Sequence, residues 1–111
     1  RAGRGDKRIA ETEFRAESLA IAQQLQGHAQ ARGVTLAQFA TAWVLANRAV
    51  SSVIAGPRTL AQWESYLPAL DCTITADDEA LIDRLVAPGH PSTPGYTDPS
   101  YPLIDLRSAA R

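Results

Sequence analysis

Methionine is absent from this chain of 111 residues, cysteine occurs once, at Cys72, and no long apolar run is present. A single cysteine excludes an internal disulfide and a cysteine zinc cluster, which is typical of a reducing compartment. We therefore expect a cytoplasmic protein with no bound metal. Because no apolar stretch approaches the roughly 20 residues that span a bilayer, we expect no membrane partner. The missing methionine leads us to expect a piece of a longer protein.

Neither sign of charge dominates the chain. The sequence has 11 lysine and arginine residues against 12 aspartate and glutamate residues, for a net charge of −1. No broad basic surface is therefore available for the phosphates of a nucleic acid, and we expect no nucleic-acid partner. The length allows one modest domain.

The first helix is predicted by apolar residues that repeat every four positions. They lie within 13–32, where glutamines occupy the other faces, and Gly33 then provides a stop for the helix. The repeating residues are Ile21, Leu25 and Ala29. The preceding residues, 1–12, are charged and show no periodicity, so we expect a loop there.

Three threonines predict the starts of three further helices. Thr35 and Thr59 each open a Thr-Leu-Ala-Gln motif, a capping box in which the hydroxyl and the amide satisfy free backbone N–H groups. Thr75 is followed within one turn by three acidic residues, which favour the positive end of a helix dipole. Five prolines beyond residue 87 predict an irregular tail over 88–111. The apolar residues that we expect these helices to bury are Leu36, Phe39, Ala40, Trp43, Val44, Leu60, Trp63, Leu67, Leu70, Leu81, Ile82, Leu85 and Val86.

A β-strand is predicted between the second and third helices. Residues 50–55 include β-branched side chains and are closed by Gly-Pro. Val53 and Ile54 are both apolar, which suggests burial on both faces, as in a parallel sheet. A lone strand leaves its backbone groups unpaired, so we expect it to pair with strands outside this chain or with a second copy. The fold class is therefore α/β, mostly helical, and incomplete on its own.

The stretch SSVIAGPRTLAQ, residues 51–62, combines three elements that bind anions. Gly56 allows close approach of the backbone, the following helix start offers free N–H groups, and Arg58 presents a planar set of donors matched to phosphate. Each element also has a plainer interpretation. Gly56-Pro57 could simply end the strand, and Arg58 could pair with a carboxylate. Gln62 could be only the partner of the helix cap.

Three stretches carry a resemblance to a known family, namely GVTLAQFATAWVLAN, VSSVIAGPRTLAQWESYLPAL and ALDCTITADDEALIDRLVAPG. Together with the proline-rich tail, they resemble the C-terminal part of an aldo-keto reductase over roughly residues 15 to 102. The resemblance implies a TIM (β/α)8 barrel, with 50–55 as its eighth, parallel strand. Residues 1–111 would then be the C-terminal portion of a single domain. The N-terminal part of the barrel would be missing, and it would be needed for folding.

The resemblance also implies an activity. The family reduces aldehydes or ketones to alcohols by moving hydride from NADPH to the carbonyl carbon, while a tyrosine donates the proton. That tyrosine works with a lysine, an aspartate and a histidine on early strands, and none of the four can be placed in this chain. We therefore assign no catalytic residue and expect the chain alone to be inactive.

What the chain retains resembles the family's clamp for the adenosine 2′-phosphate of NADPH. By that resemblance Arg58 pairs with the 2′-phosphate and Gln62 reaches adenine or ribose. Ser65 and Tyr66 stand where relatives often carry acidic and asparagine residues, and Tyr66 could stack on the base. Arg1 matches a cofactor-contacting arginine. The implied cofactor-binding residues are Gly56, Pro57, Arg58, Gln62, Ser65, Tyr66 and Arg1.

Two other functions stay open. The first is a non-catalytic regulatory relative of the same fold, because the residues that would decide it are missing here. The second is a small helical binding module, since residues 33–40 resemble the opening of a helix in helix-turn-helix proteins. Only Arg48 is basic in the turns that follow, which disfavours contact with DNA. Beyond a small carbonyl compound, the chain does not specify a substrate.

Overall fold

Five helical segments follow one another in the part of the chain described by the computed structural model, residues 7, 14–93, 95 and 100. They are α2 (Ala16–Ala31), α3 (Leu36–Leu45), α4 (Leu60–Tyr66), the 3-10 helix η2 (Leu67–Asp71) and α5 (Ala76–Leu85). These helices occupy the stretches that the sequence predicts, with ends shifted by a few residues. None of them is long and apolar enough to cross a membrane.

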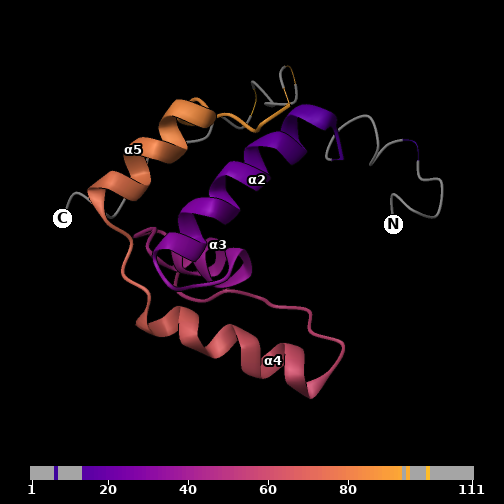
Figure 1. The fold of residues 1–111 in the computed structure, drawn as a ribbon, viewed down its shortest axis with the longest axis vertical. Coiled ribbons are helices and arrows are strands. Elements are labelled where there is room, and N and C mark those ends of the chain that lie inside the picture. The colour runs from indigo at the N-terminus through magenta and orange to yellow at the C-terminus, as the bar shows by residue number, and fades with distance from the viewer. Residues whose placement is uncertain (1–6, 8–13, 94, 96–99, 101–111) are drawn as a thin grey trace.

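Helix α3 is the centre of the arrangement, because it packs against α2 on one side and against α4 and η2 on the other (Figure 1). Helix α5 lies beside α2 (Figure 1), and two contacts link this part of the chain to α2, one from the start of α5 and one from the segment that follows it. Ser18 Oγ lies 2.9 Å from Ser92 Oγ, and His28 Nε2 lies 2.6 Å from Asp78 Oδ1. A small core forms where α2, α3 and the segment before α5 meet, and its buried members are Ala29, Phe39, Ala42 and Ile74.

The predicted helix caps are formed. Thr35 and Thr75 each accept a hydrogen bond from the backbone N–H three residues on, and in both helices the side chain at that third position accepts from the threonine N–H in return. Thr59 accepts from the N–H of Gln62 but receives no reciprocal bond. Helix α2 ends where Gly33 takes a φ of 78°, a left-handed conformation that glycine adopts without strain.

The strand predicted over 50–55 is not formed in the described residues. Residues 52–57 belong to no helix or strand, and no other strand lies among the described residues to pair with them. A strand is defined by a ladder of hydrogen bonds with a neighbour, so this segment cannot become one without a partner. The prediction of a parallel barrel strand over 50–55 is therefore not confirmed in the described residues.

The predicted burial is also wrong for much of the apolar sequence. Phe39 is buried as predicted, whereas seven of the other expected core residues are exposed, namely Ala40, Trp43, Val44, Leu60, Trp63, Leu67 and Leu70. Most of these belong to α4 and η2, which are covered by α3 on one side only. Leu36 and the four apolar residues of the last helix are half-buried. Arg1, nearly all of the 1–12 loop and most of the 88–111 tail lie outside the described residues.

Candidate functional site

The Gly-Pro-Arg turn, residues 56–58, joins the 50–55 segment to α4, whose N-cap is Thr59. A Cβ placed on Gly56 would meet no atom within 4 Å, and Gly56 is not among the described glycines with positive φ. Glycine here therefore leaves open space beside the main chain and is not demanded by the turn itself. Arg58 is exposed, and its guanidinium has no ion pair or hydrogen bond within the described residues. Such a group is available to an anion.

Gln62 supports this turn from inside α4. Its Oε1 accepts a hydrogen bond of 2.7 Å from the N–H of Arg58, and its own N–H donates to Thr59 Oγ1 at 3.2 Å. The sequence predicts that the amide returns to the N–H of Thr59, but it reaches one residue further back. Gln62 is thus a partner of the turn. Of its side-chain atoms, Oε1 is used in this contact, and Nε2 has no hydrogen-bond partner within the described residues.

Ser65 anchors the last turn of α4 to α3. Ser65 Oγ donates to the carbonyl oxygen of Gln62 at 2.6 Å, and the carbonyl oxygen of Ser65 accepts from Gln38 Nε2 at 2.8 Å. Gln38 Oε1 meanwhile accepts from the N–H of Thr35 at 3.0 Å. Sequence reasoning identified Gln38 only as a cap residue. The one available signal was that the capping box uses its Oε1 and leaves Nε2 free.

Tyr66 lies in an apolar setting. It lines a groove of about 320 Å³ between the 51–55 segment and the helices α3, α4 and η2. Leu45, Val53 and Trp63 also line this groove. The structure therefore joins Arg58 to Gln62 and Ser65 by hydrogen bonds, while Tyr66 sits among apolar side chains.

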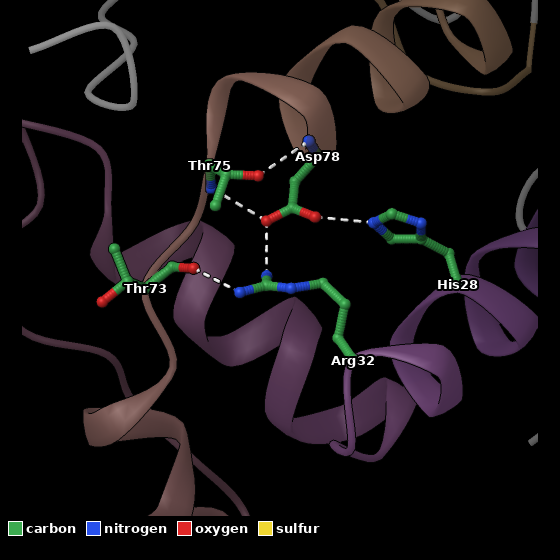
Figure 2. A network of polar contacts seen from close by, with 5 residues as sticks. All are labelled: His28, Arg32, Thr73, Thr75 and Asp78. Carbon is green, nitrogen blue, oxygen red and sulfur yellow. Dashed lines mark hydrogen bonds and ion pairs between the residues drawn. The ribbon is translucent and has the colours of Figure 1, made fainter.

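A second polar cluster joins the end of α2 to the start of α5 (Figure 2). The side chain of Asp78 is 1% exposed and accepts hydrogen bonds from His28 Nε2 at 2.6 Å and from the N–H of Thr75 at 2.8 Å. It also pairs with Arg32, which donates to the carbonyl oxygen of Thr73 at 2.8 Å. Because a carboxylate only accepts, His28 Nε2 carries a proton. This cluster holds α5 on α2, and sequence reasoning missed it by assigning Asp78 to the helix dipole alone.

Both clusters lie in the part of the chain that a family model covers. The model of the aldo/keto reductase family matches residues 2–87. The chain belongs to this family. The resemblance found in the sequence is thereby confirmed, and the match includes every candidate residue except Arg1. No curated protein and no solved structure matched the chain.

The aldo-keto reductase chain shows no metal-binding cluster in the ranges that the structure describes: no three histidine, cysteine, aspartate or glutamate side chains gather suitably. Arg1, the candidate cofactor-binding residue farthest from Arg58 in the sequence, lies outside those ranges. The candidate site in the described residues is therefore the turn at Arg58 with the contacts that support it.

Opposing effects act on the pKa of Asp78 in the reductase chain. Burial alone would raise it. The hydrogen bonds from the N–H of Thr75 and from His28, a further contact with the Thr75 side chain, and the positive charge of Arg32 outweigh burial. The pKa of the Asp78 carboxyl is therefore held below its ordinary value of 3.8.

This lowered pKa predicts a stability that decreases in acid. The contribution of Asp78 is fully present above the ordinary carboxyl pKa of 3.8 and is lost as the pH falls through the lower folded-state pKa. We expect the free energy of unfolding to decrease more steeply below that value in the parent protein than in Asp78→Asn. Urea denaturation at a series of acidic pH values measures both slopes, and parallel curves would contradict the assignment.

Proposed function

We propose that this chain is the C-terminal part of an NADPH-dependent aldo-keto reductase that reduces aldehydes or ketones to alcohols, and that it holds the adenosine 2′-phosphate of the cofactor. Family membership supports the oxidoreductase chemistry. The observation that carries the cofactor assignment is the exposed guanidinium of Arg58, which has no partner among the described residues and follows the open space at Gly56 by two positions.

Arg58 has the properties that recognition of a phosphate group requires. Its guanidinium stays charged at physiological pH and offers several donors in one plane, which match two phosphate oxygens at once. Gly56 adds no side chain to the adjacent space, and Pro57 restricts the backbone of the turn. Since NADH lacks the 2′-phosphate, this contact acts on NADPH alone and distinguishes the two cofactors.

The other proposed contacts follow from the family resemblance. Gln62 Nε2, Ser65 and Tyr66 are assigned to the adenine and ribose side, and Arg1 is assigned to the cofactor without a specified group. When bound, the nicotinamide supplies the hydride. The residues that donate the proton and bind the small carbonyl substrate belong, in this proposal, to earlier parts of the barrel, so this chain orients the cofactor and performs no proton transfer itself.

The segment before Arg58 supports a place for the chain in a TIM barrel. Val53 and Ala55 line the groove against the helices, whereas Ile54 between them is 99% exposed. Apolar residues on both faces are typical of a parallel strand that is covered on both sides. We therefore assign residues 50–55 to the eighth strand within one domain, preceded by the 1–12 loop and followed by the 88–111 tail. The remaining strands would come from the N-terminal part of the barrel, which completes the fold.

Arg58→Ala tests the cofactor assignment in the complete reductase. We expect the Kd for NADPH to increase by about 10- to 100-fold, because a charge-assisted contact contributes about 1.5–3 kcal/mol. The Kd for NADH should change little, since NADH has no 2′-phosphate. Titration followed by protein fluorescence or calorimetry measures both constants.

Arg48→Ala is the matched control, because Arg48 is exposed and lies on the loop after α3, ten residues before Arg58 in the sequence. It removes the same charge from the protein and should leave both Kd values unchanged. Equal weakening of NADPH and NADH in Arg58→Ala would overturn the 2′-phosphate assignment.

A further inference from the structure

Four hydrogen bonds connect the start of α3 to the turn at Arg58. The N–H of Thr35 donates to Gln38 Oε1 at 3.0 Å, and Gln38 Nε2 donates to the carbonyl oxygen of Ser65 at 2.8 Å. Ser65 Oγ then donates to the carbonyl oxygen of Gln62 at 2.6 Å, and Gln62 Oε1 accepts from the N–H of Arg58 at 2.7 Å. We call these three intermediate residues, Gln38, Ser65 and Gln62, the relay.

We propose that the relay residues are positioning residues, which hold the Arg58 turn in a fixed orientation on α3. The role rests on the proposed function of Arg58, because a positioned guanidinium matters only if it binds the 2′-phosphate. The family resemblance gives Gln62 and Ser65 direct contact with adenosine. In this structure Gln62 Oε1 and Ser65 Oγ each make a hydrogen bond within the protein, so both residues also act on the turn, in addition to the direct contacts proposed above.

The polar contacts supplement the packing of α4 against α3. The helix has seven residues, and none of them is buried. Helices this short are marginal without tertiary contacts. Gln38 is the relay residue that lies on another element, so its Nε2 contact sets how α4, and with it Arg58, is oriented against α3.

Gln38→Glu separates the two functions of this side chain. Glutamate retains an oxygen that accepts from the N–H of Thr35, and it is a favoured residue at this position of a capping box. It has no donor for the carbonyl oxygen of Ser65 and places a negative charge against it. We therefore expect an almost unchanged melting temperature but a Kd for NADPH raised about fivefold, as for the loss of one hydrogen bond of about 1 kcal/mol.

Two comparisons show whether Gln38 acts through Arg58. Gln26→Glu makes the same chemical change at an exposed position of α2 and should leave both cofactors unaffected. In an Arg58→Ala background, Gln38→Glu should have no further effect on NADPH, because the residue being positioned is gone. The Kd for NADH should be the same in all of these variants.

The outcomes distinguish the relay from the proposed function. Suppose that Arg58→Ala weakens the binding of NADPH but not of NADH, while Gln38→Glu leaves the Kd for NADPH unchanged. The relay is then overturned, and the proposed 2′-phosphate contact of Arg58 stands. Additive effects of the two substitutions, or equal weakening of NADPH and NADH by Gln38→Glu, would also overturn the relay. If Arg58→Ala changes the Kd values for NADPH and NADH equally, the 2′-phosphate assignment itself is overturned.

Discussion

Replacing Asp78 by alanine is expected to lower the free energy of unfolding by about 3 kcal/mol. The Asp78 side chain is 1% exposed, and its removal leaves His28 and Arg32 without the carboxylate that they share. It also removes the acceptor for the N–H of Thr75 at the start of α5. We choose the lower end of the range for a broken buried ion pair because the side chains of His28 and Arg32 are each 27% exposed, so water solvates them in part. Urea denaturation measures the difference.

The neighbouring aspartate provides the control for this prediction. Asp77 is also in the first turn of α5, but it is exposed. Asp77→Ala should therefore cost only the helix-dipole contribution, about 0.5 kcal/mol. Similar losses for the two alanine variants would mean that Asp78, too, contributes only through the dipole and that the cluster adds no stability.

The sequence predicts the helix caps well because the necessary information is local. In α3 and α5 the threonine and its reciprocal partner are three residues apart, so both lie within one motif. The same locality explains the partial failure at Thr59. Its motif is identical to that of Thr35, yet Gln62 Oε1 accepts from the N–H of Arg58 instead, because the preceding residues, which differ, bring that N–H within reach.

The Asp78 cluster depends on contacts that no local motif contains. His28 and Arg32 are 50 and 46 residues away from Asp78 in the sequence. One signal was nevertheless present: the two basic residues are one helical turn apart and therefore share a face of α2. His28 also packs edge-on against Phe39, with ring centroids 5.6 Å apart, so the polar cluster borders the core. A pair of basic residues beside apolar positions predicts an acidic partner, but not which one.

The anion site at the turn stays a prediction, whereas the contacts that support the turn were not predicted at all. The motif Gly56-Pro57-Arg58 suggests such a site from the sequence alone, and Arg58 is exposed, as that function would require. The link from Gln38 to Ser65 spans 27 residues and depends on how α3 and α4 pack. Such packing follows from the tertiary arrangement, which single motifs do not encode.

Ile54→Asp is expected to prevent folding of the complete reductase, although the described structure taken by itself predicts almost no effect. In the described structure the Ile54 side chain is 99% exposed, so an aspartate there would remain in water and cost almost nothing. In a barrel the same position lies on a strand covered on both faces, and an unpaired buried carboxylate costs several kcal/mol. That cost is comparable with the entire stability of a domain, about 5–15 kcal/mol.

The yield of soluble protein and the melting temperature of the variant distinguish these two environments. Ile54→Val is the conservative control, because it removes one methylene group and should cost only about 1 kcal/mol even in a packed barrel. A soluble Ile54→Asp reductase with the parent's melting temperature would show that this side chain faces water in the complete protein too. The unpaired backbone of residues 52–57 would then be an exposed loop, and the assignment of residues 50–55 to the eighth strand would be wrong.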